Sequence, residues 1–162
     1  MKTGWKSLLF ALTTALFLGS CGSDVVLDEW TTFPDQSWHM DSAVVAVWEP
    51  KDAETPVFMS MYIRHLVDYP YNNLYLFRTI ESTEGVEYAD TVNVALADAL
   101  GRWNGEGLST LKMLHIPIGK GAVRFRNEER YTLRIQQGMR DTLLEGIQDV
   151  GIKFEAATQL EE

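Results

Sequence analysis

The hydrophobic pattern of this 162-residue chain alternates with a period of two, and this feature limits the fold more than any other. In residues 57–64, Val, Met, Met and Ile alternate with Phe, Ser, Tyr and Arg, which is the pattern of a half-buried β-strand. Similar alternation, or a short apolar run between turn residues, marks seven more candidate strands. They are residues 43–48, 74–80, 91–96, 110–116, 122–125, 130–135 and 149–155.

Clusters of glycine, proline and asparagine separate these candidate strands, and residues 119–121 have the composition of a tight hairpin turn. Only residues 136–144 have a helical pattern, with Met139 and Leu143 one turn apart and Gly146 just beyond. The pattern therefore predicts an all-β chain. We expect an antiparallel β-sandwich, jelly-roll-like, of about eight strands with at most one short helix.

The first twenty residues have the organisation of an export signal. Lys2 and Lys6 precede an apolar run of eleven residues, 8–18, which is too short to span a bilayer and fits a signal-peptide core. The segment Leu18-Gly19-Ser20-Cys21 that follows resembles the lipobox of bacterial lipoproteins. That resemblance implies that the thiol of Cys21 carries diacylglycerol and that cleavage occurs just before it.

The cysteine count supports lipidation, because Cys21 is the only cysteine and exported proteins usually use cysteines in disulfide pairs. We expect a signal peptide over 1–20, a lipidated cysteine and tether over 21–41, and one sandwich domain over 42–162. The lipid on Cys21 would attach the chain to a membrane of the cell envelope, with the outer membrane expected and its face left open.

Net charge excludes one class of partner. The formal charge is −9, and loss of Lys2 and Lys6 with the signal peptide takes it to −11. Binding to nucleic acid depends on Lys and Arg side chains that neutralise phosphates, so a nucleic-acid partner is not expected.

The sequence offers no catalytic constellation. His39, His65 and His115 have no metal-ligand spacing, and no Gly-x-Ser-x-Gly elbow is present. We therefore predict no enzyme activity, no catalytic residue, no metal and no cofactor.

Two loops are richer in aromatic side chains than a simple connection requires. Residues 69–73 place Tyr69 and Tyr71 around a proline, and residues 101–107 place Arg102 and Trp103 among three glycines. Because exposed Tyr, Trp and Arg are typical of interface hot spots, these four residues are the candidate interaction surface. The rings could instead cap the ends of the sandwich or stack on a sugar. The Tyr69–Pro70 bond is a candidate for the cis isomer.

Four arginines cluster near one expected hairpin. If residues 123–126 pair with residues 130–135, Arg124, Arg126, Arg130 and Arg134 share one face of a sheet. Such a face would either dock an acidic partner or be balanced by nearby acids.

Several segments resemble the family of gliding-motility lipoproteins called GldH. They are Asp68-Tyr69-Pro70-Tyr71-Asn72-Asn73-Leu74-Tyr75-Leu76-Phe77, Asp90-Thr91, Leu96-Ala97-Asp98, residues 101–107, residues 131–140 and residues 144–151. The resemblance covers about residues 30–155 and includes the lipobox. It implies an envelope lipoprotein that serves gliding or the associated secretion machinery, and it carries no catalytic residues over to this chain.

Three segments match an acid, hydroxyl, apolar pattern that resembles O-glycosylation sites of exported proteins in these bacteria. The acceptor residues would be Ser42, Thr91 and Thr142, although Asp-Ser and Asp-Thr are also common in turns.

Two functional hypotheses follow. The first is a non-enzymatic lipoprotein that docks onto envelope motility or secretion proteins, and the alternative is a lipid-anchored glycan-binding module. A flat apolar patch rimmed by arginine would favour the first, whereas Tyr69, Tyr71 and Trp103 exposed on one concave face would favour the second.

Overall fold

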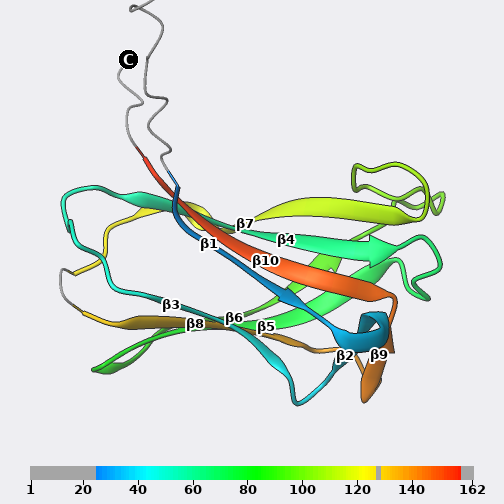
Figure 1. The fold of residues 1–162 in the computed structure, drawn as a ribbon, viewed down its shortest axis with the longest axis horizontal. Helices are drawn as coiled ribbons and strands as arrows, with labels where there is room; N and C mark the ends of the chain where they lie inside the picture. Colours follow the sequence, from blue (N-terminus) through cyan, green and yellow to red (C-terminus); the bar gives the residue numbers. More distant parts are fainter. Residues whose placement is uncertain (1–24, 127–128, 158–162) are drawn as a thin grey trace, which may run out of the picture.

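The computed structural model describes residues 25–126 and 129–157, so the signal peptide and Cys21 lie outside the described residues. Two four-stranded antiparallel sheets pack face to face, and a short two-stranded ribbon closes one end (Figure 1). The prediction of an all-β antiparallel fold is confirmed. The described part of the chain has ten strands, rather than about eight, and one short 3₁₀ turn.

The first sheet has the strand order β1-β10-β4-β7 and the second sheet the order β3-β8-β5-β6. The first sheet consists of β1 (Val25–Thr32), β10 (Ile147–Ala156), β4 (Val57–Leu66) and β7 (Leu111–Val123). The second consists of β3 (Ala43–Trp48), β8 (Tyr131–Gln137), β5 (Asn73–Ser82) and β6 (Gly85–Ala95). The ribbon pairs β2 (Ser37–His39) with β9 (Leu143–Glu145), and the 3₁₀ turn η2 is Pro34–Gln36.

The core lies between the two sheets, where the alternate residues of each strand meet. Met61 and Ile63 of β4 and Leu74 and Leu76 of β5 are fully buried there. At the ribbon, Trp38 is also fully buried, and its ring stacks on Phe33 at a centroid distance of 4.8 Å. The period of two in the sequence thus reflects one face of each sheet packed against the other.

Residues 25–39 belong to the sandwich, although the sequence pattern placed them in the tether. Strand β1 pairs with β10 from Val25, opposite Glu155, to Thr32, opposite Asp149. Strand β1 lies at the edge of its sheet and buries little of its surface. Its exposed positions include Asp28 and Glu29, so its composition resembles that of a linker. The folded domain therefore begins at or before Val25 and not at the predicted boundary of residue 42.

Residues 136–144 do not form the predicted helix. Strand β8 continues to Gln137. The side chain of Gln137 then forms hydrogen bonds with the backbone of the following loop. The amide nitrogen of Gln137 donates to the carbonyl oxygen of Asp141 (2.8 Å), and its amide oxygen accepts from the backbone N–H of Met139 (2.8 Å). These bonds give the backbone an alternative to helical hydrogen bonds.

Residues 119–121 do not form a hairpin turn but lie within a bulge of β7. Met59 of β4 pairs with Ile118, and Val57 pairs with Val123, so four β7 residues stand opposite one β4 residue. Because β7 pairs with β4 and β8 pairs with β3 and β5, residues 123–126 and 130–135 do not form a hairpin. No cis peptide bond occurs in the described chain, so the Tyr69–Pro70 bond is trans.

The sandwich has two distinct ends. At the proximal end, β1 begins and β10 finishes, and Val57 and Val123 lie beside them (Figure 1). At the distal end lie the ribbon and the loops 67–72 and 96–110. Residues 25–126 and 129–157 contain no helix long and apolar enough to cross a membrane.

Candidate interaction surface

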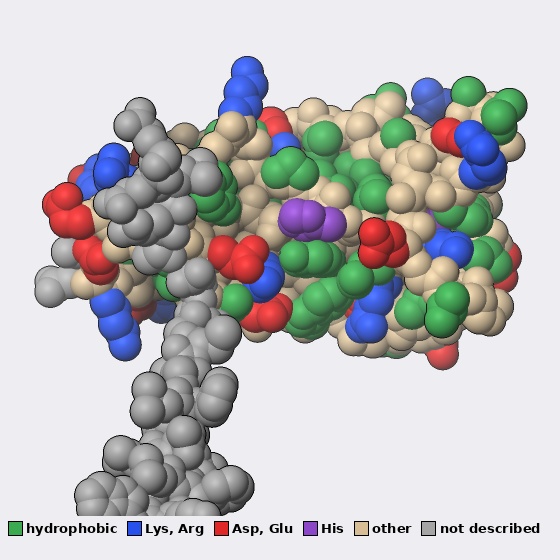
Figure 2. Space-filling model, turned by 90° about the horizontal axis from the view of Figure 1, so that it is seen from above, with side chains coloured by type: hydrophobic (Ala, Val, Ile, Leu, Met, Phe, Trp, Pro, Cys, Tyr) green, Lys and Arg blue, Asp and Glu red, His purple; other side chains and the backbone are tan. Residues whose placement is uncertain are grey.

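The outer face of the first sheet carries a group of partly exposed aromatic and apolar side chains. We call this group the aromatic face, and it consists of Trp30, Phe58, Tyr62, Met113, His115 and Pro117. The strand register brings most of them together, because Tyr62 pairs with His115 and Trp30 pairs with Gly151 on the intervening strand. Figure 2 shows hydrophobic side chains grouped around a histidine on this face.

Three rings form a row across the sheet. The Trp30 and Tyr62 centroids are 5.8 Å apart, and the Tyr62 and His115 rings stack at 4.7 Å with an angle of 21° between their planes. Trp30 reaches over β10 because Gly151 has no side chain. A Cβ atom at Gly151 would lie 2.7 Å from Cδ2 of Trp30.

An ion pair fixes one side of this row. Arg64 donates from Nε to Oδ1 of Asp149 (2.6 Å) and from Nη2 to Oδ2 (2.5 Å), and the Asp149 side chain is 1% exposed. The guanidinium carbon lies 4.9 Å from the centre of the Trp30 ring. The bonds to Asp149 raise the pKa of Arg64, so the charge persists. The paired geometry and the ring contact hold this arginine in one place.

Charged groups also border the aromatic face near its edge strand. The indole nitrogen of Trp30 donates to Asp28 (2.8 Å), and Lys153 pairs with Glu155 (2.6 Å). An apolar centre with a polar rim is the arrangement found in protein–protein interfaces.

The structure places the two predicted tyrosines side by side at the distal end, but only one is exposed. The Tyr69 side chain is 4% exposed, and burial raises its pKa. Its hydroxyl donates to the carbonyl oxygen of Asn73 (3.1 Å). Tyr71 is exposed, packs edge-on against Tyr69 at 5.8 Å, and donates to Asp141 (2.6 Å). Tyr69 is therefore part of the hydrophobic core and does not contribute to an exposed surface.

Trp103 and Arg102 lie in the neighbouring loop with different surroundings. Trp103 is half-buried, and its ring packs against His65 at 4.6 Å. Arg102 is exposed and pairs with Asp98 through Nε (2.8 Å). The distal loops thus gather the four predicted residues at one end without forming a single exposed aromatic surface.

His65 is a buried histidine in the same cluster. Its Nδ1 lies 2.9 Å from the carbonyl oxygen of Leu66 and therefore donates to it, because a carbonyl oxygen only accepts. Its Nε2 has no hydrogen-bond partner among the described residues. Burial, together with the positive charge of Lys112, lowers the pKa of His65.

The four arginines do not share one face of a hairpin, because residues 123–126 and 130–135 do not pair. Arg126 is surrounded by three carboxylates and pairs with Glu84 (2.9 Å), Glu87 (2.7 Å) and Glu129 (2.6 Å). Arg130 lies 3.9 Å from Glu49, whereas Arg134 points outward from the second sheet. Three acids surround Arg126, so this arginine contributes no net positive charge for an acidic partner.

The remaining candidate positions are dispersed. Ser42, Thr91 and Thr142 are all exposed. His39, His65 and His115 stand on β2, β4 and β7 respectively. Within residues 25–126 and 129–157, no group of three or more His, Cys, Asp or Glu side chains is placed to hold a metal ion.

Comparison with known proteins identifies the family. The model of the GldH lipoprotein family matches residues 25–154. The chain belongs to the GldH lipoprotein family. It is 31% identical to a protein of Christiangramia forsetii named gliding motility lipoprotein GldH homolog, over 96% of this chain and 98% of that protein. It is 30% identical to gliding motility lipoprotein GldH of Flavobacterium johnsoniae, over 89% of this chain and 92% of that protein. No solved structure is significantly similar to it.

The family match confirms the GldH resemblance predicted from the sequence motifs. In this GldH-family chain, sequence reasoning nevertheless missed the aromatic face. The outward positions of residues 57–64 include Phe58 and Tyr62, which are unusual on a solvent-facing side. Gly151 within an apolar strand is a second signal, because glycine in a strand often marks close approach by another group.

Proposed function

We propose that this chain is a lipid-anchored, non-catalytic component of the gliding-motility apparatus or its associated secretion machinery, and that it binds a protein partner through the aromatic face. Both relatives are named as gliding motility lipoproteins or their homologs. The anchor is a lipid on Cys21, placed in the outer membrane.

The aromatic face carries this proposal. Its rings are held in fixed positions by the stacking of Tyr62 on His115 and by the Arg64–Asp149 pair. A rigid exposed patch loses little side-chain entropy on binding, and aromatic residues with arginine supply most of the energy in hot spots.

The alternative, a glycan-binding module, has less support. It required Tyr69, Tyr71 and Trp103 on one concave exposed face, but Tyr69 is buried and Trp103 packs on His65. The rings of Tyr62 and His115 also stack face to face, which leaves less ring surface free for a sugar.

Crosslinked affinity purification from intact envelopes tests the proposal. The wild type is compared with the double variant Phe58→Ser, His115→Ser and with the control Phe77→Ser. Phe58 is 44% exposed and Phe77 is 49% exposed, so the control removes a similar ring from the outer face of the second sheet. Motility or secretion proteins should be recovered with the wild type and the control but depleted at least tenfold with the double variant.

Equal recovery with all three proteins would overturn the use of the aromatic face. A further variant, Cys21→Ala, tests the anchor separately. It should leave the membrane fraction, whereas a membrane-bound variant would contradict lipidation at Cys21.

A further inference from the structure

The proximal end of the sandwich contains an open pocket between the exposed edges of the two sheets. Its volume is about 430 Å³, which falls within the range of roughly 300–1,000 Å³ typical of small-molecule sites. The bulge at residues 119–122 creates it, because the bulge separates β7 from β4. The chain then crosses through Arg124, Phe125 and Arg126 toward the second sheet and forms the outer wall.

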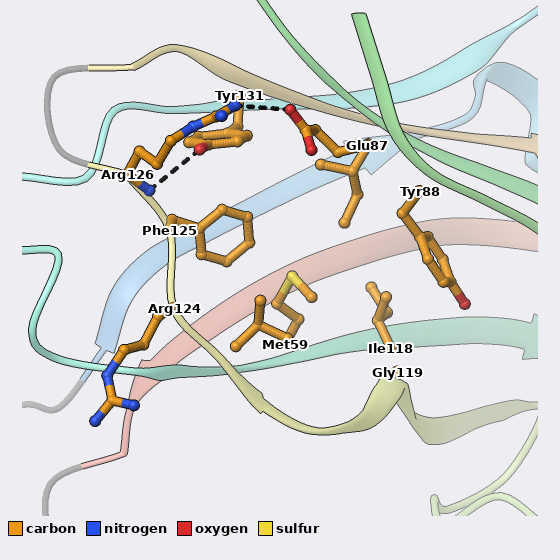
Figure 3. A pocket seen from close by; sticks show the side chains of 11 residues that line it. Met59, Glu87, Tyr88, Ile118, Gly119, Arg124, Phe125, Arg126 and Tyr131 are labelled. Atoms are coloured by element: carbon orange, nitrogen blue, oxygen red, sulfur yellow. Dashed lines mark hydrogen bonds and ion pairs between the residues drawn. The ribbon is translucent and has the colours of Figure 1, made fainter. Parts of the chain in front are cut away.

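The interior of this pocket is apolar. Seven of the eleven lining residues are aliphatic or aromatic or are methionine. Figure 3 shows Met59, Ile118 and Phe125 around the hollow, with Tyr88 on the opposite wall. The remaining lining residues are Gly119 and the charged Glu87, Arg124 and Arg126, so the apolar side chains form the part of the pocket that an apolar group of a ligand would fill.

Two cations near the mouth, Arg124 and Lys120, have no carboxylate partner among the described residues, whereas the lining residue Glu87 pairs with Arg126. Arg126 is neutralised by Glu84, Glu87 and Glu129. Arg124, by contrast, donates to the carbonyl oxygen of Glu54 (3.1 Å) and has no carboxylate partner among the described residues, and its side chain is directed away from the hollow (Figure 3). Lys120, exposed in the bulge next to the lining residue Gly119, has no carboxylate within 4 Å among the described residues. An apolar interior with cations at its entrance suits an amphiphile with an anionic head.

The pocket lies at the end of the domain that is nearest to Cys21, so the anchoring membrane is the source of such a molecule. Val25 and Val123 are separated by three strand spacings, about 14 Å, across the proximal end. Cys21 precedes Val25 by four residues, which span at most about 14 Å. With Cys21 lipidated, Val123 at the pocket mouth can therefore lie no more than about 28 Å from the anchored residue, which keeps the pocket within reach of lipid.

We infer that this pocket binds one acyl chain of an anionic phospholipid of the anchoring membrane, with the lipid phosphate next to Lys120 and Arg124. The inference rests on the proposed function only through the anchor at Cys21. It assigns the proximal end to lipid and leaves the aromatic face for the protein partner.

Displacement of a fluorescent fatty acid, 11-(dansylamino)undecanoic acid, tests this assignment. The protein used is the soluble chain from Gly22 onward, which keeps every described strand and lacks the lipid anchor. One equivalent of probe should bind, and phosphatidylglycerol should displace it at least tenfold more effectively than phosphatidylcholine.

Three variants locate the site. Val123→Trp fills the mouth from a position 39% exposed and should weaken probe binding at least tenfold. Lys120→Glu with Arg124→Glu should remove the preference for phosphatidylglycerol. The control Lys51→Glu, an exposed lysine at the same end but outside this pocket, should change neither result.

Two results would overturn the assignment: no probe bound to the wild-type chain, or binding unchanged in both Val123→Trp and the double charge reversal. Circular dichroism of each variant confirms that a loss is not caused by unfolding. Because no partner is present, failure here leaves the docking proposal intact. Conversely, Phe58→Ser with His115→Ser should abolish partner recovery while leaving probe binding unchanged.

Discussion

The guanidinium of Arg78 is buried between the sheets and donates two hydrogen bonds to the carboxylate of Asp90 on the neighbouring strand. The distances are 2.9 Å from Nε to Oδ1 and 2.5 Å from Nη2 to Oδ2. The hydroxyl of Tyr88 donates to the same carboxylate (2.5 Å), and Nη1 of Arg78 lies 3.5 Å from the carbonyl oxygen of Pro117 on the first sheet. The two bonds from Arg78 and the one bond from Tyr88 lower the pKa of Asp90 despite its partial burial.

Asp90→Asn should destabilise the protein by about 2–3 kcal/mol, since removing one partner leaves a buried charge unpaired. The loss stays below that of a fully enclosed pair because the Asp90 side chain is 28% exposed. Urea denaturation measures it. The more exposed pair Arg102–Asp98 offers the control. Arg102→Ala should lower the free energy of unfolding by less than about 1 kcal/mol. Equal losses for the two variants would contradict the role assigned to Arg78 and Asp90.

Gly151→Ala should disturb the aromatic face directly. The new Cβ would lie 2.7 Å from Trp30, so the indole must move and the stability should fall by about 1–3 kcal/mol. Urea denaturation and tryptophan fluorescence report the two effects. Gly121→Ala is the matched control, because a Cβ there has no heavy atom within 4 Å and should change stability by less than about 0.5 kcal/mol. An unshifted emission spectrum for Gly151→Ala would contradict the placement of Trp30.

His65 should make the protein less stable in mild acid. Burial lowers its pKa in the folded state, so below the ordinary value of 6.5 the unfolded chain binds the proton more readily. Stability is therefore full above pH 6.5 and falls as the pH drops toward the lowered pKa of the folded protein.

The variant His65→Phe, which cannot titrate, tests this prediction. At pH 7.5 it should be less stable by about 1 kcal/mol through loss of the hydrogen bond to Leu66. The difference in stability between the wild type and His65→Phe should become smaller as the pH is lowered to 5. The urea midpoint of each protein, measured at each pH, reports this difference. A gap that stays constant over this range would contradict burial of the neutral imidazole.

O-glycosylation at Ser42, Thr91 or Thr142 would raise the intact mass of the native protein above that of the lipidated polypeptide. Ser42 and Thr142 lie outside the strands, and the backbone N–H of Met40 donates to the carbonyl oxygen of Thr142 (2.8 Å). Thr91 is paired within β6, so we expect it to be modified less than the other two. Replacement of all three residues by alanine should remove the extra mass, and a native mass without any excess would contradict modification.

Much of the fold could be predicted because the alternation in residues 43–48, 57–64 and 74–80 directly reflects burial on one face. Strand β1 was not predicted from the sequence, because it lies at the edge of its sheet and exposes Asp28 and Glu29 to solvent. Strand β9 is three residues long, which gives too few positions for a period to show.

The candidate surface could not be predicted in the same way, because it depends on strand register. Arg64 meets Asp149 across 85 positions of sequence, and Trp30 reaches Tyr62 only because Gly151 lies between them. Periodicity assigns each residue to a face of its own strand but does not say which strands are neighbours. The aromatic composition of loops 69–73 and 101–107 predicted an interaction surface there, but Tyr69 is buried in the core and Trp103 is half-buried.

Strand β1 gives the sandwich a favourable direction for bearing load. It begins at the proximal end and runs toward the distal end, paired with β10 over almost its whole length. If the lipid proposed at Cys21 is pulled while the proposed partner holds the first sheet, the force acts along β1. The backbone hydrogen bonds to β10 then share the tension in shear and do not open one at a time. A component that joins a membrane to a moving apparatus would thus resist detachment at the strand nearest its anchor.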